Sequence, residues 1–311
     1  MQLRRLGRTE LMVSPVSYGA SPLGGVFGDV DTAAGIACVH RAIELGVNLI
    51  DVSPYYGLTK AETVLGQALA GGWRKRVILC TKAGRIGDEQ FDFSARQIVR
   101  SLDESLRRFG TDYVDILQAH DIEFADDFSQ LFDETAGALH RLKEQGKCRF
   151  VGMTGYPLGL LAEAIERCDL DVVLSYCRFS LLDDSLIERL LPIAERYDVG
   201  VINASPLSMG LLSDKGPPAW HPAPEAIKSA CRQAVEHCRT RGTDLARLAM
   251  QYVLSNEHVP TTLVGTSSAQ KIEENVRALS APPDPDLLRE VQQILAPVHD
   301  RTWPSGNWTG D

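Results

Sequence analysis

Four residues whose side chains can hold or transfer protons lie in or just after three short apolar segments. Asp51, Lys82 and His120 each end such a segment, and Tyr56 follows Asp51 by five residues. A free tyrosine has a pKa near ~10, so it is a weak base at neutral pH. A lysine ammonium about 4 Å from the phenol would favour the phenolate and lower its pKa by about two or three units. These residue types could therefore move a proton to or from an alcohol or a carbonyl oxygen.

The four side chains suggest different roles. Asp51 can pair with Lys82 and keep it charged, so it would act on Tyr56 only through Lys82, while His120 can exchange a hydrogen bond with the reacting oxygen. None of the four accepts a hydride, so oxidation or reduction requires a bound hydride carrier. Three alternatives remain: a strand end with a helix-capping Asp and a packed loop Tyr, a structural ion pair between Asp51 and Lys82, or a metal site that includes His120 and Asp121. No second His or Cys at ligand spacing supports a metal.

Short apolar segments alternate with helical patterns along the chain. The predicted strands span residues 15–19, 47–51, 77–82, 113–120, 148–152, 172–176, 200–204 and 261–264. The predicted helices span residues 31–45, 59–70, 94–109, 130–145, 158–167, 185–197, 225–240, 244–255 and 268–278. Short apolar strands without alternation are typical of a parallel sheet buried on both faces.

Eight such units are the number that closes a (β/α)₈ barrel, whose strands present their carboxyl ends at one rim. We therefore predict an α/β fold, a (β/α)₈ TIM barrel in which Asp51, Lys82 and His120 are neighbours. A β-hairpin at residues 3–13 would plug one end, and an extra C-terminal helix at residues 285–295 would precede a tail. The alternative, a doubly wound sheet, usually carries Gly-x-Gly-x-x-Gly after its first strand, which is absent here. Residues 1–311 are predicted to form a single domain.

Composition and charge narrow the class of protein. Of 311 residues, 44% are hydrophobic and 23% charged, which is enough to bury a large core. A net charge of −9 argues against nucleic acid or a membrane surface as the main partner. Seven cysteines without a Cys-x-x-Cys pair indicate reduced thiols and a cytoplasmic protein. The N-terminus lacks the apolar region of a signal peptide, and no apolar run is long enough to span a membrane.

Asp51, Tyr56, Lys82 and His120, together with the hairpin, resemble the aldo-keto reductases. Supporting motifs follow in the family's order along the whole chain: 46–51 (Gly-Val-Asn-Leu-Ile-Asp), 113–117 (Tyr-Val-Asp-Ile-Leu), 205–212 (Ser-Pro-Leu-Ser-Met-Gly-Leu-Leu), 265–267 (Gly-Thr-Ser) and 273–275 (Glu-Glu-Asn). The resemblance implies that these four residues are catalytic and that a nicotinamide cofactor binds across the barrel rim.

The cofactor-binding positions implied by the resemblance contain several departures from the family's pattern. Thr154 and Gly155 stand where the family has Ser-Asn, and Ser175-Tyr176 where a Gln is common. Ala204 falls where an aromatic often stacks on the nicotinamide, so Tyr176 or Met209 would have to hold the ring. The implied set is Gly19, Ala20, Ser21, Thr154, Ser175, Tyr176, Ser205, Leu207, Gly210, Leu211, Gly265, Thr266, Ser267, Lys271, Glu274 and Asn275.

The positions that contact the 2′-phosphate in NADP-preferring members predict NAD here. These members place a Lys and an Arg against that phosphate, at positions that align with Gly265 and Lys271. One cation is therefore missing, and the other lacks the planar fork that grips a phosphate with two hydrogen bonds. Glu274 and Asn275 look suited to the adenine.

Residues 19–24, 91–94, 120–123, 216–222 and 302–306 resemble the NAD-linked branch of the family that oxidises a free aldose at C1 to the lactone. We predict such an oxidoreductase acting on a small sugar, L-galactose first, with Tyr56 as general base and Tyr56, His120 and Asp121 as substrate contacts. Asp121 replaces a Trp that is typical of members with apolar substrates, but it could equally be a loop or helix-cap residue. Other aldoses (L-fucose, D-arabinose), pyridoxal, general carbonyl reduction and a cofactor-binding regulatory subunit remain alternatives.

Overall fold

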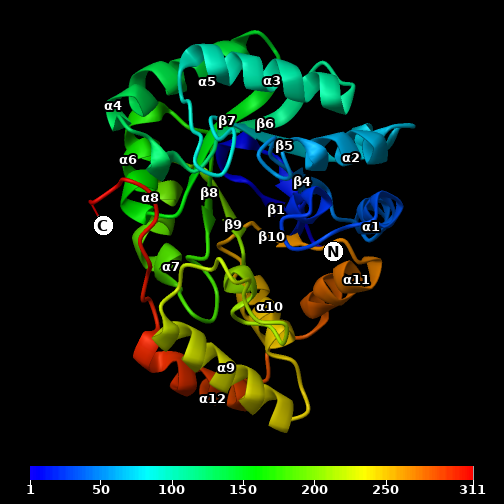
Figure 1. Ribbon diagram of the computed structural model, residues 1–311, viewed down its shortest axis with the longest axis vertical. Helices are drawn as coiled ribbons and strands as arrows, with labels where there is room; N and C mark the ends of the chain where they lie inside the picture. The colour runs from blue at the N-terminus through cyan, green and yellow to red at the C-terminus, as the bar shows by residue number, and fades with distance from the viewer. Residues whose placement is uncertain (311) are drawn as a thin grey trace.

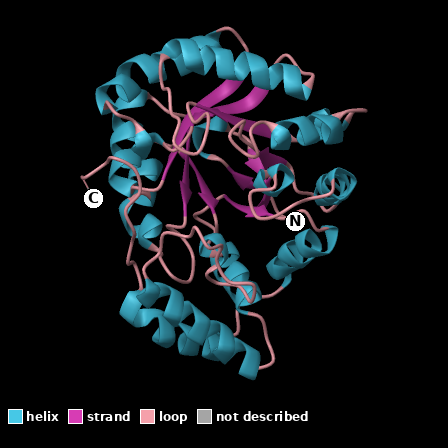
Figure 2. Ribbon diagram, in the orientation of Figure 1, coloured by secondary structure: helices cyan, strands magenta, loops and turns pink. Residues whose placement is uncertain are grey.

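The computed structural model describes residues 1–310. Its centre is a closed barrel of eight parallel strands, and Figures 1 and 2 show the strands enclosed by helices. The strands, in the order in which they neighbour one another, are β3 (Val16–Gly19), β4 (Leu49–Asp51), β5 (Ile78–Ala83), β6 (Val114–Ala119), β7 (Cys148–Gly155), β8 (Val172–Tyr176), β9 (Gly200–Ala204) and β10 (Thr261–Gly265), which pairs with β3. The predicted (β/α)₈ barrel is confirmed. A single domain over residues 1–311 stays a prediction.

The helices cover the outside of the barrel as predicted, with two differences in detail. They are α1 (Thr32–Glu44), α2 (Lys60–Leu69), α3 (Ala95–Phe109), α4 (Phe128–Gln130), α5 (Ala136–Glu144), α6 (Leu158–Cys168), α7 (Ser185–Arg189), α8 (Leu191–Arg196), α9 (Glu225–Thr240), α10 (Leu245–Ser255), α11 (Ala269–Arg277) and α12 (Pro285–Leu295). A π-helical segment, Leu131–Thr135, joins α4 to α5 where one helix over 130–145 was predicted. The predicted helix 185–197 is divided into α7 and α8 because Pro192 has no N–H to continue the helix.

The N-terminal hairpin closes the barrel at the amino ends of its strands. It pairs β1 (Arg4–Arg5) with β2 (Met12–Val13). Between them, Leu6 is fully buried among the apolar side chains that fill the barrel, namely Val13, Leu49, Cys80, Ile116, Val172, Leu174, Ile202 and Leu263. Gly7 has φ +49°, and a Cβ there would lie 2.3 Å from the backbone N of Gly200, the first residue of β9. The predicted plug is confirmed.

The C-terminal segment returns to the barrel after α12. Figure 1 shows α12 beside α9 and the following tail running up the side of the barrel toward α4 and α6. The backbone N–H of Asn307 donates to the carbonyl of Glu123 at 2.6 Å. A Cβ at Gly306 would lie 2.2 Å from the same carbonyl oxygen, so only glycine permits this approach. The tail is therefore fixed on the loop that follows β6.

The described residues fit two further expectations from composition. No helix in residues 1–310 is long and apolar enough to cross a bilayer. All seven cysteines are unpaired and buried, as the predicted reduced thiols require.

Leu6→Ala should lower the free energy of unfolding by about 2–5 kcal/mol, because it removes a fully buried side chain from a packed barrel interior. Leu3→Ala, at a residue that is 38% exposed, is the matched control and should change it by no more than about 0.5 kcal/mol. Urea unfolding of both variants measures the difference, and equal stabilities would contradict the role of Leu6 as the plug.

Candidate active site

A tight turn at the end of β4 presents Tyr56 over the rim. The backbone N–H of Tyr56 donates to the carbonyl of Ser53 at 3.1 Å, which closes residues 53–56. Pro54 occupies the second position, where its fixed φ favours a turn. The hydroxyl of Ser53 also accepts the backbone N–H of Tyr55 at 3.1 Å, the local bond that makes serine a common turn residue. The Ser-Pro-Tyr-Tyr sequence thus encodes the conformation that positions the Tyr56 phenol.

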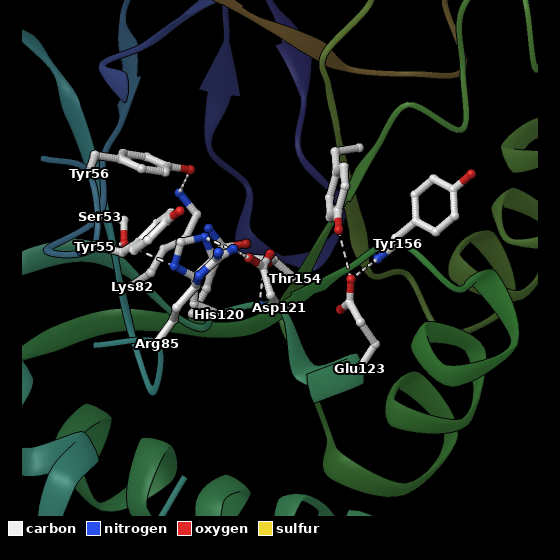
Figure 3. A network of polar contacts seen from close by, with 12 residues as sticks. Ser53, Tyr55, Tyr56, Lys82, Arg85, His120, Asp121, Glu123, Thr154 and Tyr156 are labelled. Carbon is white, nitrogen blue, oxygen red and sulfur yellow. Dashed lines mark hydrogen bonds and ion pairs between the residues drawn. The ribbon is translucent and has the colours of Figure 1, made fainter. Parts of the chain in front are cut away.

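The structure brings the predicted catalytic residues together, as Figure 3 shows for Tyr56, Lys82 and His120. Lys82 and Asp51, which are 1% and 3% exposed, form an ion pair between neighbouring strands. The same ammonium donates to the carbonyl of Val52 at 3.1 Å and to the Tyr56 hydroxyl at 3.5 Å. Gln118 on β6 donates to the second oxygen of Asp51 at 3.4 Å. Lys82 is therefore held between an anion and a phenol.

Burial and charge act in opposite directions on Lys82. Desolvation by burial favours the neutral amine, but the Asp51 carboxylate and the Tyr56 phenol outweigh it and raise the pKa of Lys82 above its ordinary value. The ammonium form therefore persists in a place where an isolated lysine would lose its proton.

The Tyr56 hydroxyl does not have the lowered pKa that we expected from the sequence. Burial is the largest influence and raises the pKa of Tyr56 to about 12, although the Lys82 ammonium lowers it. The expectation of a net lowering was wrong, because it counted the attraction of Lys82 and omitted the cost of placing a phenolate in a desolvated site.

His120 follows β6 and faces the phenol. Its ring lies 5.6 Å from that of Tyr56, at 90° to it, and its Nδ1 is 2.9 Å from the hydroxyl of Ser53. Burial lowers the pKa of His120 to about 3. The imidazole is therefore neutral at physiological pH and can offer one N–H and one lone pair.

Arg85 was not predicted from the sequence, although it lies two residues after β5. Its guanidinium pairs with Asp121 at 2.5 Å and lies 3.7 Å from the centre of the Tyr55 ring. Asp121 is 6% exposed and 3.6 Å from His120 Nε2. Asp121 occupies the N-cap position of the short helix Ile122–Phe124, but its side chain makes no capping hydrogen bond. Its predicted contact with substrate stays a prediction. The strand-end rule that selected Lys82 did not reach Arg85, because Arg85 lies two residues past the end of β5.

Glu123 is a second residue that sequence reasoning missed. It is fully buried, and its carboxyl group accepts a hydrogen bond from the Tyr176 hydroxyl at 2.8 Å. The same group accepts the Tyr156 backbone N–H at 3.1 Å, as Figure 3 shows. Burial raises the pKa of Glu123 to about 8. A Cβ at Gly155 would lie 3.1 Å from its Oε2, so this carboxyl group occupies space beside Gly155, where the family has a longer side chain. No sequence spacing pointed to this contact.

The predicted nicotinamide positions fit the group in part. The Ser175 hydroxyl at the end of β8 is buried and has no hydrogen-bond partner among residues 1–310, so it remains available to an amide. Thr154 already accepts the backbone N–H of Asp121 at 2.9 Å. Tyr176 has its hydroxyl on Glu123 and its ring 5.4 Å from that of Tyr156.

The predicted phosphate and adenine positions lie on loops after β3, β9 and β10. Gly19 pairs with Gly265 across two neighbouring strands, and Ala20 and Ser21 follow directly. Ser205 has a positive φ and Leu207 precedes the short helix Ser208–Gly210. The Leu211 side chain is buried in a cluster with α9 and α12, so only its backbone is available. Thr266, Ser267 and Asn275 lie at or in α11, whose N-terminus suits an anion.

Two residues of α11 bear on the choice of cofactor. The ammonium of Lys271 lies 2.7 Å from the carboxylate of Glu274. Both side chains are at least one-third exposed, and the hydrogen bond from Lys271 lowers the pKa of Glu274. The one cation at the aligned phosphate positions is therefore already paired with an anion.

The barrel and this site define an oxidoreductase, and the family model of the aldo/keto reductases matches residues 15–296. The chain belongs to this family. It is 48% identical to the L-galactose dehydrogenase of Arabidopsis thaliana over 98% of each chain. It is also 32% identical to the D-arabinose 1-dehydrogenase of Saccharomyces cerevisiae over 94% of each. Among solved structures, an aldo-keto reductase of Bacillus halodurans in its holo form is similar, with a TM-score of 0.80 and 28% identity over 99% of this chain and 100% of that one.

Asp51→Asn should lower the free energy of unfolding by about 3–5 kcal/mol, because it leaves the buried Lys82 charge without its partner. Asp103→Asn removes the partner of Lys147 from an ion pair whose side chains are 33% and 38% exposed, and should cost at most about 1 kcal/mol. Chemical denaturation of the two variants checks this difference, and a loss for Asp51→Asn no greater than that of the control would contradict it.

Proposed function

We propose that this protein is an NAD-dependent aldose 1-dehydrogenase that oxidises a free aldose at C1 to the lactone. We propose L-galactose as its main substrate. The observation that carries the proposal is the buried ion pair of Asp51 and Lys82 directed at the Tyr56 phenol beside a neutral His120. The chain's 48% identity to an L-galactose dehydrogenase supports the choice of substrate.

In this proposal each residue has one task. Tyr56 takes the proton of the anomeric hydroxyl, Lys82 stabilises the phenolate that this requires, and His120 holds the same sugar oxygen. Asp51 does not contact substrate and acts by keeping Lys82 charged. The nicotinamide cofactor, which aldo-keto reductases use, supplies the acceptor for the hydride that leaves C1.

The walls of the site suit a polyhydroxylated substrate. The ion pair of Arg85 and Asp121 places charged hydrogen-bonding groups beside His120, and the acceptor capacity that remains on the Asp121 carboxylate suits a sugar hydroxyl better than an apolar ligand. We propose that Asp121 accepts a hydrogen bond from a sugar hydroxyl while Arg85 keeps it ionised. Lys271 is occupied by Glu274, whose charge would repel a 2′-phosphate, and this supports NAD over NADP. We also propose a cytoplasmic location.

A panel of aldoses offered with NAD and with NADP, followed by nicotinamide absorbance, tests the proposal. We expect L-galactose with NAD to give the highest initial rate and a lactone as product. A higher rate with NADP would contradict the cofactor assignment. Turnover of carbonyl compounds but no aldose would indicate a reductase, and cofactor binding without turnover would indicate a regulatory subunit.

Tyr56→Phe should lower kcat by at least ~100-fold, because it removes the group that accepts the proton in the transition state. Tyr113→Phe is the matched control: Tyr113 is 41% exposed and directly precedes the amino end of β6, opposite to the site. Its kcat should match that of the unchanged protein. Steady-state kinetics with the best aldose decide the matter, and near-normal turnover of Tyr56→Phe would remove Tyr56 from the mechanism.

The rate of oxidation should rise with pH. The base is the phenolate, and because the pKa of Tyr56 is raised to about 12, its ionised fraction grows with pH throughout the range below that value. We expect kcat/KM for oxidation to increase roughly tenfold per pH unit between about pH 7 and 10, as for a single ionising base. A pH–rate profile tests this, and a flat or falling profile would show that another group takes the proton.

A further inference from the structure

Ser53 is fully buried in the turn that presents Tyr56, and the mechanism above gives it no task. We infer that Ser53 fixes His120 in the tautomer that carries its proton on Nε2, so that His120 can only donate a hydrogen bond to the substrate oxygen. This makes Ser53 a positioning residue that acts through His120. The consequence for catalysis rests on the proposed function, whereas the tautomer itself does not.

The argument begins with the hydrogen bonds available to one hydroxyl group. A serine hydroxyl donates one hydrogen bond and accepts up to two. Ser53 accepts from the backbone N–H of Tyr55 at 3.1 Å, and its other partner is His120 Nδ1 at 2.9 Å. No other acceptor for its proton is found among residues 1–310. If Nδ1 were the donor, the Ser53 proton would be buried without a partner, which is costly.

The opposite side of the imidazole leads to the same tautomer. A carboxylate oxygen of Asp121 lies 3.6 Å from Nε2. An ionised carboxylate only accepts hydrogen bonds, and Arg85 keeps Asp121 ionised by pairing with that oxygen. A lone pair on Nε2 would face this negative charge, whereas an N–H is attracted to it. A hydrogen-bond donor at Nδ1 and an anion at Nε2 therefore both favour the Nε2–H form.

The neighbouring rings keep the imidazole in place. His120 is 3% exposed and has Tyr56 and Tyr55 against it at ring distances of 5.6 and 6.0 Å, both edge-on. Ser53 and Tyr56 belong to the same four-residue turn, closed by the bond from Tyr56 N–H to the Ser53 carbonyl. One turn thus determines both the position of the Tyr56 phenol and which nitrogen of the His120 imidazole carries the proton.

This tautomer divides the chemistry between two residues. As the C1 hydride passes with two electrons to NAD⁺, the hydroxyl proton passes to Tyr56, giving the lactone and NADH. His120 donates through Nε2–H to the oxygen that loses this proton and cannot accept it. Tyr56 is therefore the sole base, and a proton on Nδ1 would instead leave the substrate oxygen facing a lone pair.

Nitrogen-15 NMR of the imidazoles tests the tautomer in the free protein. The chain has seven histidines, so the His120 signals are assigned from their loss in His120→Gln. We expect Nδ1 to be unprotonated and Nε2 protonated at pH 7. A proton on Nδ1, or on both nitrogens, would overturn the inference. This measurement needs no variant of Ser53 and no substrate.

Ser53→Ala should make the Nδ1–H form of His120 detectable and lower kcat about 10-fold. This expectation follows the effect of losing a hydrogen-bond partner that orients a metal-binding histidine. Ser17→Ala is the control, because Ser17 is equally buried but bonds Thr261 and not His120. In Ser17→Ala the His120 tautomer and kcat should match those of the unchanged protein. An unaltered tautomer and kcat in Ser53→Ala would overturn the inference. If NMR finds the Nε2–H tautomer but the protein oxidises no aldose, the inference about the tautomer stands and only the proposed function is overturned.

Discussion

The charge pair of Asp51 and Lys82 is the interaction on which the rest of the site depends. Removing two charges from water costs several kcal/mol for each ion, and attraction offsets this only when the remaining donors and acceptors also find partners. Here they do: Lys82 reaches the carbonyl of Val52 and the phenol of Tyr56, and Gln118 supplies a donor to Asp51. Asp51, Lys82 and Gln118 come from the neighbouring strands β4, β5 and β6, and Val52 and Tyr56 come from the segment that follows β4. The pair and Gln118 therefore link β4, β5 and β6 through their side chains at the rim where Tyr56 lies.

Desolvation acts differently on the groups around this pair. It keeps His120 neutral and Tyr56 protonated, while Lys82 stays charged because an anion is in contact with it. A low local dielectric also strengthens each remaining charge interaction. The site is thus prepared to stabilise a negative charge on the phenol or on a bound oxygen, and it carries no such charge in the resting protein.

Sequence patterns predicted the parts of this structure that depend on local order. Apolar segments predicted the strands, and the residues that end them predicted three of the four catalytic candidates. Contacts between residues distant in the chain were not accessible: the approach of Glu123 to Gly155 depends on how the short helix after β6 packs against the end of β7. The pKa of Tyr56 was wrongly predicted because the degree of burial cannot be read from spacing. Pro192, in contrast, could have predicted the division between α7 and α8.

The bond between Asn307 and Glu123 has a consequence for the order in which the chain can mature. Residue 307 is synthesised long after residue 123, and domains begin to fold during synthesis. Until the tail arrives, the Glu123 carbonyl lacks its partner, and the Ser305 hydroxyl is missing from the Glu123 carboxyl group. The loop that begins with Asp121 is therefore completed among the last parts of the molecule, although β6 belongs to its first half. A nascent barrel lacking only these residues would already contain Lys82 and Tyr56, beside a loop that still lacks two of its hydrogen-bond partners.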